Sequence, residues 1–167
     1  DKGSDTEIMA YIEFLLSGKL GDVNKSEVAK YYKMAADKGN ILAMNEYAKM
    51  MRNGDGVQID KEEAGKYYKM AAEKGNVKSM NTYAMMSMNG EIECDKKEAF
   101  AYLTDAANSG YDAAIYNLGI AIYRGHGTAA NKAAAIELLK KAARKGVKEA
   151  VDSLKSLGVK YEGCSIY

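Results

Sequence analysis

The sequence has no proline and no tryptophan among its 167 residues, and it has only two cysteines and one histidine. Without proline the strongest helix breaker is missing, so long uninterrupted helices are favoured. Cys94 and Cys164 cannot form a disulfide scaffold, and they lack the CxxC spacing of a zinc or redox site. This cysteine usage favours a reducing compartment such as the cytoplasm, although the sequence does not identify the compartment.

The sequence also lacks an excess of charge of either sign. Lysine plus arginine number 24 and aspartate plus glutamate number 23, so there is no strong positive field to attract nucleic acid or an anionic membrane. No apolar run approaches the roughly 18 residues of a membrane helix, and the first residues, DKGSDTE, do not resemble a secretory signal. We therefore expect neither nucleic-acid binding nor membrane insertion.

What the sequence has instead is an internal repeat. KYYKMAADKGN ends at Asn40 and KYYKMAAEKGN ends at Asn76, and two weaker copies end at Tyr111 and Val147. The glycines of these copies are spaced 36, 35 and 36 residues apart, at Gly39, Gly75, Gly110 and Gly146. This spacing predicts one supersecondary unit that is used four times.

Each unit contains two helical patterns, of which the second in the chain is the clearer. This second pattern has apolar or small residues with the spacing of an amphipathic helix, as at Val28, Tyr31, Tyr32, Ala35 and Ala36. Residues that can cap a first turn precede it, with a glutamate three residues later in three copies, and the repeated glycine follows it. The predicted caps are Asn24, Asp60, Asp95 and Asn131, and the glutamates are Glu27, Glu63 and Glu98.

The first helical pattern of the unit carries Ala43, Met44, Tyr47, Ala48 and Met51, with related residues in the later copies. A glycine ends each copy, and a small residue near the middle allows close approach of the paired helix. These glycines are Gly54, Gly90 and Gly125, and the small residues are Ala48, Ala84 and Gly119. The two helices should therefore form a tight antiparallel pair.

The domain organisation follows from this register. We expect a solenoid over residues 1–158, with repeats at 4–39, 40–75, 76–110 and 111–146, a terminal helix at 147–158 and a tail at 159–167. Ser4 and Glu7 should form the first capping box. Asp1-Lys2-Gly3 matches Asp37-Lys38-Gly39, the end of a second helix, which indicates a fragment of a longer protein.

The repeat resembles the Sel-one-like repeat (SLR), a relative of the tetratricopeptide repeat, over nearly the whole chain. YAKMMRNG, YAMMSMNG and LGIAIYRG carry the resemblance in the first helix, and YYKMAADKG, YYKMAAEKG, YLTDAANSG and LLKKAARKG carry it in the second. It implies an all-α fold, a right-handed α/α solenoid superhelix of antiparallel helix pairs. Members of the family are generally adaptors that hold other proteins on a concave surface of first helices. One secreted branch is associated with penicillin-type ligands, but it has a cysteine pair in each repeat, which this chain lacks.

The resemblance and the register together predict a binding surface for a protein or peptide partner. A core at Met44, Tyr47, Ala48 and Met51 leaves the positions between them facing the concave side of the first helices. The predicted partner-binding residues are Met9, Glu13, Leu16, Asn45, Lys49, Arg52, Asn81, Met85, Met88, Tyr116, Ile120 and Tyr123.

Two kinds of contact are expected on this surface. Met85, Met86 and Met88 beside the tyrosines could accommodate apolar anchors of a partner helix or extended peptide. Lys49 and Arg52 could hold an acidic side chain or a terminal carboxylate. The alternative is that several of these side chains pack against the neighbouring repeat.

No pattern in the sequence predicts catalysis, a metal or a cofactor. His126 is interpreted as a turn residue because no second histidine could complete a metal cluster, and GHGTAA follows no strand that would make it a dinucleotide fingerprint. Glu91, Glu93 and Asp95 lack the ligand spacing of a calcium loop, and Asn24 is a predicted cap despite its glycosylation sequon. We expect a non-catalytic scaffold or adaptor; a structural spacer in a longer array is the alternative, and an enzyme or small-molecule receptor is a remote one.

Overall fold

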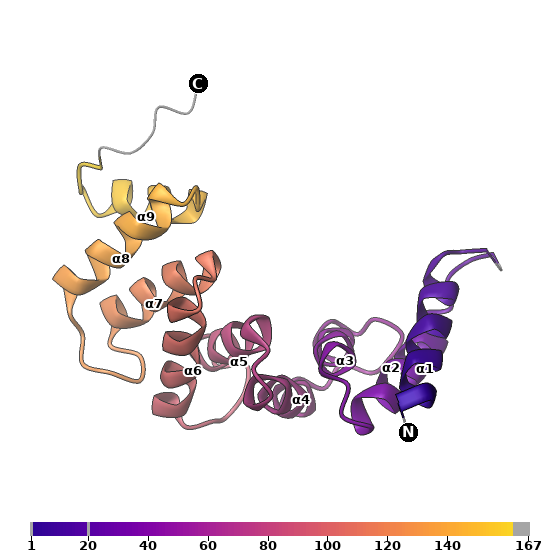
Figure 1. The fold of residues 1–167 in the computed structure, drawn as a ribbon. Coiled ribbons are helices and arrows are strands. Elements are labelled where there is room, and N and C mark those ends of the chain that lie inside the picture. Colours follow the sequence, from indigo (N-terminus) through magenta and orange to yellow (C-terminus); the bar gives the residue numbers. More distant parts are fainter. Residues whose placement is uncertain (1, 20, 162–167) are drawn as a thin grey trace. The chain divides into compact units, whose positions relative to one another are not determined.

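The computed structural model describes residues 2–19 and 21–161, with side chains from residue 5 onward. These described residues contain nine α-helices and no strand (Figure 1). The helices are α1 (Lys2–Leu16), α2 (Lys25–Asp37), α3 (Ile41–Asn53), α4 (Lys61–Glu73), α5 (Val77–Met88), α6 (Lys96–Asn108), α7 (Asp112–Arg124), α8 (Lys132–Arg144) and α9 (Lys148–Ser156). The odd-numbered helices are the first helices of the repeat, and the even-numbered helices are the second.

The described residues up to Ser79 form one compact unit and those from Met80 form a second. In the first unit α1 packs on α2, α2 on α3 and α3 on α4. In the second unit α6 packs on α7, α7 on α8 and α8 on α9. Packing of the helices mainly on their neighbours in the sequence is typical of a solenoid, so the predicted all-α fold of helix pairs is confirmed.

The helix ends follow the predicted caps. Asn24, Asp60 and Asn131 each accept a backbone N–H three residues later, at 3.2, 2.9 and 3.0 Å, and Asp95 accepts the N–H of Lys97 at 2.8 Å. Two of the predicted glutamates interact with other side chains: Glu27 accepts a hydrogen bond from Tyr11 Oη, and Glu63 accepts one from Lys66 Nζ. The four repeated glycines end the second helices with positive φ, between 84° and 97°.

The capping box predicted at the N-terminus is wrong. α1 begins at Lys2, so Ser4 lies inside the helix rather than at its cap. A serine followed by a glutamate three residues later also occurs within helices, and the motif alone does not fix a helix start.

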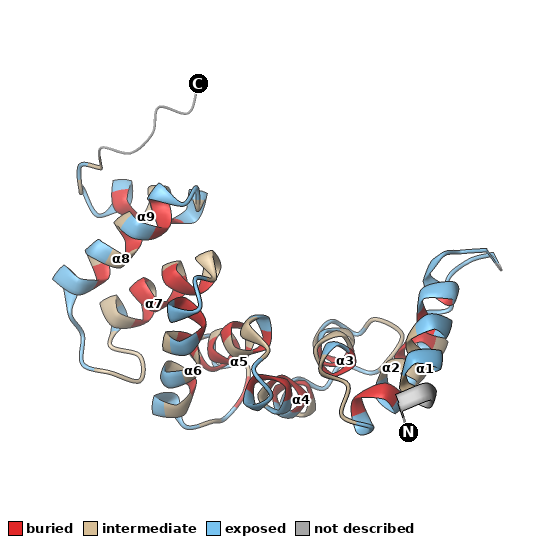
Figure 2. Cartoon of the chain, viewed as in Figure 1, coloured by how far each residue is buried: buried red, intermediate tan, exposed pale blue. Residues whose placement is uncertain are grey.

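Alanine and glycine make the seams between helices. The alanine pairs that precede the repeated glycines are buried in every second helix, and buried residues occur where neighbouring helices face one another (Figure 2). A Cβ on Gly119 would lie 3.2 Å from Cγ of Leu139 in α8, which confirms the predicted close approach of the helix pair.

The C-terminal part of the chain continues the pattern with one first helix. α9 packs on α8 and buries Ala150 and Leu154. Residues 162–167 of the predicted tail lie outside the described residues. No helix in the described part of the chain is both long and apolar enough to cross a membrane.

Candidate protein-binding surface

The residues of the first helices that lie between the core positions are exposed or half-buried. In α3, Met44, Tyr47, Ala48 and Met51 are buried, whereas the side chain of Lys49 is 59% exposed. Asn45 and Arg52 on the same face are half-buried. Helical geometry explains this, because residues on neighbouring positions point about 100° apart around the axis.

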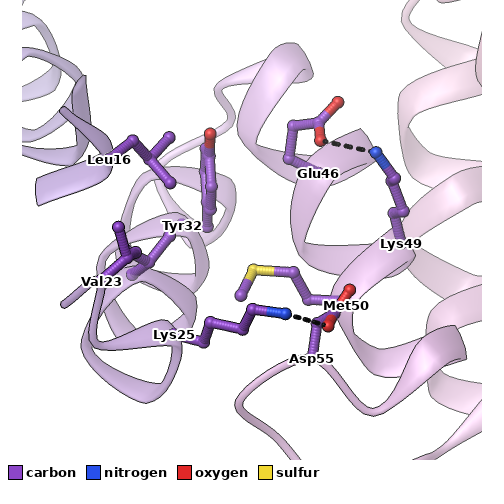
Figure 3. A pocket seen from close by; sticks show the side chains of 9 residues that line it. Leu16, Val23, Lys25, Tyr32, Glu46, Lys49, Met50 and Asp55 are labelled. Carbon is purple, nitrogen blue, oxygen red and sulfur yellow. Dashed lines mark hydrogen bonds and ion pairs between the residues drawn. The ribbon is translucent and has the colours of Figure 1, made fainter. Parts of the chain in front are cut away.

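A groove lies between α1, α2 and α3 in the first unit, with a volume of about 200 Å³ (Figure 3). Leu16 and Lys49, both predicted from the sequence, line it together with Tyr32 of α2 and Met50 of α3. Neither Tyr32 nor Met50 was predicted for this surface: Tyr32 was assigned to the amphipathic stripe of the second helix, and Met50 lies beside the predicted series of Asn45, Lys49 and Arg52. Both residues pack against the core cluster and also line the groove.

Charges at the edge of this groove are paired. Lys25 Nζ lies 2.8 Å from Asp55 Oδ1, and Lys49 Nζ lies 3.8 Å from Glu46 Oε2 (Figure 3). Burial raises the pKa of Tyr32, and the carboxylates of Glu46 and Glu13 raise it further, so its hydroxyl stays protonated and can donate a hydrogen bond. The groove thus combines apolar walls with balanced charges.

The second unit has a groove in the corresponding place, between α7 and α9. Its volume is about 420 Å³. Tyr116, Ile120 and Tyr123, three residues predicted from the sequence, line it from α7. From α9 it is lined by Glu149, Asp152, Ser153 and Ser156, and Leu157 lines it directly after the end of α9. The α9 residues of this groove were not predicted, because the partner-binding positions were assigned only in the four complete repeats. The repeat period of 36 residues leads from Tyr116 to Asp152, which would have indicated the α9 wall.

One position of the repeat connects successive first helices. Asn45 accepts from Ser79 Oγ at 2.9 Å, Asn81 accepts from Asn117 Nδ2 at 2.8 Å, and Tyr116 Oη lies 3.4 Å from Ser153 Oγ. Asn45, Asn81 and Tyr116 occupy equivalent positions in the repeat. Asn81 is only 9% exposed. The side chains at this position therefore use at least one of their hydrogen-bonding groups for contact with the neighbouring repeat.

Of the remaining predicted residues, some pack against the core or are half-buried and one is exposed. Met9 packs against the core cluster of Ile12, Leu15 and Val28, while Glu13 is exposed on α1. Met85 and Met88 are half-buried on α5, but Met86 is 0% exposed, so its expected place in the methionine cluster is wrong. Met86 follows Met85 by a single residue, which turns its side chain toward the core.

The described residues do not form a candidate metal site. They contain no group of three or more His, Cys, Asp or Glu side chains that could hold a metal ion. The groove of the first unit has apolar walls with charged groups at its edge, and the α7–α9 groove has an aromatic and aliphatic wall on α7 that faces a mainly polar wall on α9.

Pairs of antiparallel helices stacked in sequence order, with grooves between successive first helices, define the class of α-solenoid repeat proteins. The model of the Sel1 repeat family matches residues 9–40, 41–76, 77–111 and 112–147. The chain belongs to the Sel1 repeat family. Proteins of this family are generally scaffolds for protein interactions and typically not enzymes.

Solved structures of similar fold include three bacterial proteins. A Sel1 repeat protein from Oxalobacter formigenes is 22% identical, with a TM-score of 0.79 over 95% of this chain and 68% of that chain. A protective antigen of uropathogenic Escherichia coli with an SLR fold is 24% identical, with a TM-score of 0.80 over 95% of this chain and 35% of that one. Cysteine-rich protein B of Helicobacter pylori is 23% identical, with a TM-score of 0.57 over 77% and 96%. A search of curated proteins finds no match.

Proposed function

We propose that this chain is a non-catalytic scaffold that binds a peptide or helix of a partner protein along its first helices. The observation that carries the proposal is the groove between successive first helices, which occurs in both units at the corresponding place. Each groove offers an aromatic or aliphatic wall for an apolar anchor and polar groups for orientation.

The predicted residues contribute unequally to this proposal. Ile120 and Tyr123 line the α7–α9 groove, and Leu16 and Lys49 line the groove of the first unit. Asn45, Asn81 and Tyr116 support it indirectly, because their hydrogen bonds hold successive first helices at a fixed spacing. A groove held in place before binding loses less conformational entropy when a partner enters.

The α7–α9 groove can be tested without knowing the natural partner. Random peptides displayed on phage are selected on the wild-type chain, and the binding of enriched peptides is measured to an Ile120→Glu/Tyr123→Glu variant. We expect affinity to fall about tenfold or more, because the carboxylates would be placed against apolar anchors.

A matched control changes exposed apolar residues away from the grooves. Met34 and Met70 are each 41% exposed on α2 and α4, so a Met34→Glu/Met70→Glu variant adds the same charge elsewhere. It should bind the selected peptides as the wild type does. Equal loss in both variants, or no loss in the groove variant with an unchanged circular dichroism spectrum, would contradict the proposal.

A structural spacer is the second candidate function. The hydrogen bonds between successive first helices favour it, because they serve the array rather than a ligand. A spacer would yield no enriched peptide that depends on either groove.

A further inference from the structure

The turn after a first helix packs against the start of the preceding second helix, and it does so in the same way in both units. In the first unit Gly56 follows α3, and a Cβ there would collide with the backbone of Lys25 at the start of α2. In the second unit Gly127 follows α7, and a Cβ there would collide with the backbone of Lys96 at the start of α6. The two turns, Gly54–Asp55–Gly56 and Gly125–His126–Gly127, are therefore equivalent in space and in register.

The charges at these equivalent places differ. In the first unit Asp55 Oδ1 lies 2.8 Å from Lys25 Nζ, so the lysine has a carboxylate partner. In the second unit His126 occupies the place of Asp55, and its Nε2 lies 3.3 Å from Ser87 Oγ. Across the residues that the structure describes, neither Lys96 nor the nearby Arg124 forms an ion pair. The second unit thus keeps the lysine and lacks its counter-ion.

A cavity of about 480 Å³ opens at this place. Ser87, Lys96 and His126 line it, and Ser87 is only 6% exposed. Met88 and Ile92 add apolar walls, and Glu93 and Cys94 complete the titratable part of the lining. The carboxylate of Asp95, next to Lys96, is already bonded to the N–H of Lys97.

We propose that Ser87, Lys96 and His126 form a binding site for a carboxylate, which takes the place that Asp55 fills in the first unit. The lysine ammonium, the serine hydroxyl and a protonated imidazole are all hydrogen-bond donors to such a group. That the carboxylate belongs to a partner peptide rests on the proposed function, whereas the site itself does not. It lies outside the α7–α9 groove, since the two linings share no residue.

Protonation of His126 couples to this binding. Burial lowers the pKa of His126, and the cations Lys96 and Arg124 lower it further. A bound carboxylate counters both cations and stabilises the imidazolium, so it raises the pKa of His126. By linkage, carboxylate affinity increases as the pH falls through the pKa of this histidine, while Glu93 opposes binding at every pH at which it is ionised.

The single histidine of the chain makes the site directly observable by nuclear magnetic resonance. The probes are acetate, inorganic phosphate, an N-acetylated tetraglycine with a free C-terminus, and its C-terminally amidated form carrying one internal glutamate. In low-salt buffer we expect acetate and at least one peptide to give saturable shifts of the His126 ring and of the amides of Lys96 and Gly127, with a raised His126 pKa.

Three variants locate the site. Lys96→Gln should weaken carboxylate binding about tenfold, because it removes one charge-assisted hydrogen bond. His126→Asp restores the carboxylate of the first unit beside Lys96, so it should abolish the amide shifts. Lys25→Gln makes the same change as Lys96→Gln at the paired lysine of the first unit, and it should leave binding unchanged.

Each outcome decides the proposal. Binding by the free C-terminus alone assigns the site to chain ends, and binding by the internal glutamate assigns it to acidic side chains. Shifts with phosphate only, shifts that survive His126→Asp in a folded protein, or no saturable shift would overturn it. Peptide selection at the α7–α9 groove is unaffected by these results, so the two proposals fail separately.

Discussion

The alanine pairs of the second helices are buried between packed helices. Ala71 of α4 is 0% exposed, whereas Ala101 of α6 is exposed. Ala71→Leu should lower the free energy of unfolding by about 1 to 3 kcal/mol, because added methylene groups force neighbouring side chains or backbone to move. Ala101→Leu is the matched control and should change it by less than about 0.5 kcal/mol in thermal or urea unfolding. Equal stability of the two variants would mean that the helix faces are assigned incorrectly.

Asp37 at the end of α2 connects to its own helix and to α4. Its carboxylate lies 2.7 Å from Lys33 Nζ and accepts a hydrogen bond from Tyr67 Oη at 2.9 Å. Lys33 chiefly, and Tyr67 in addition, hold the pKa of Asp37 below its ordinary value. A lowered pKa in the folded state gives stabilisation that is complete above the unfolded pKa of about 3.9 and lost as the pH falls through the folded value.

Asp37→Asn should therefore lower stability at pH 7 but not at about pH 2. The side chains of Lys33 and Asp37 are about half exposed, so we expect only about 0.5 kcal/mol at pH 7. Tm measured from pH 2 to pH 7 for both proteins checks this. A difference that stays constant across the range would show that the carboxylate charge is not its cause.

At the scale of elements, hydrogen bonds between first helices fix their spacing. Asn81 of α5 and Asn117 of α7 are 9% and 8% exposed, and one amide donates to the other at 2.8 Å. Asn81→Ala should cost about 1 to 3 kcal/mol, because it leaves a buried donor of Asn117 without its partner. The double variant with Asn117→Ala should cost less than the sum of the two single variants. Additive losses in urea unfolding would indicate that the two amides act independently.

The elements themselves could be predicted from the sequence, and much of the surface could not. The repeated Ala-Ala pair and the amphipathic spacing before it predicted the second helices and their buried faces, because local propensity and periodicity agree there. The same register placed Lys49 and Ile120 on exposed or groove-lining positions. It could not distinguish Asn81, which bonds to Asn117, from a residue that is free to bind a partner, because that depends on a contact 36 residues away.

The grouping of Ser87, Lys96 and His126 around one cavity could not be predicted from the sequence. A lone histidine between two glycines is indistinguishable from any other turn residue until Lys96 and Ser87 are seen beside it. The one available signal was the comparison of Asp55 with His126 in the repeat register, which shows a carboxylate replaced by an imidazole at a position opposite a lysine.

At the scale of the whole molecule, helices that pack mainly on near neighbours in the sequence transmit a perturbation over a short range. α3 and α4 pack on each other in the first unit, and α8 and α9 pack on each other in the second. Ala71→Leu should therefore speed amide hydrogen exchange in α3 and α4 while α8 and α9 keep their rates. Mass spectrometry of exchanged peptides measures this, and equal acceleration in all four helices would show a single cooperative unit.

Within the repeat, the hydrogen-bonded position at Asn45, Asn81 and Tyr116 and the position four residues after it differ in what a substitution would change. A substitution at the hydrogen-bonded position disturbs a contact with the adjacent repeat. The position four residues later carries a carboxylate, an ammonium, a thioether and an aliphatic side chain in the four repeats, at Glu13, Lys49, Met85 and Ile120. On the proposed function, mutation at that second position would change which partner is recognised while the hydrogen bonds between repeats are retained, so that duplicated repeats would acquire new specificities one side chain at a time.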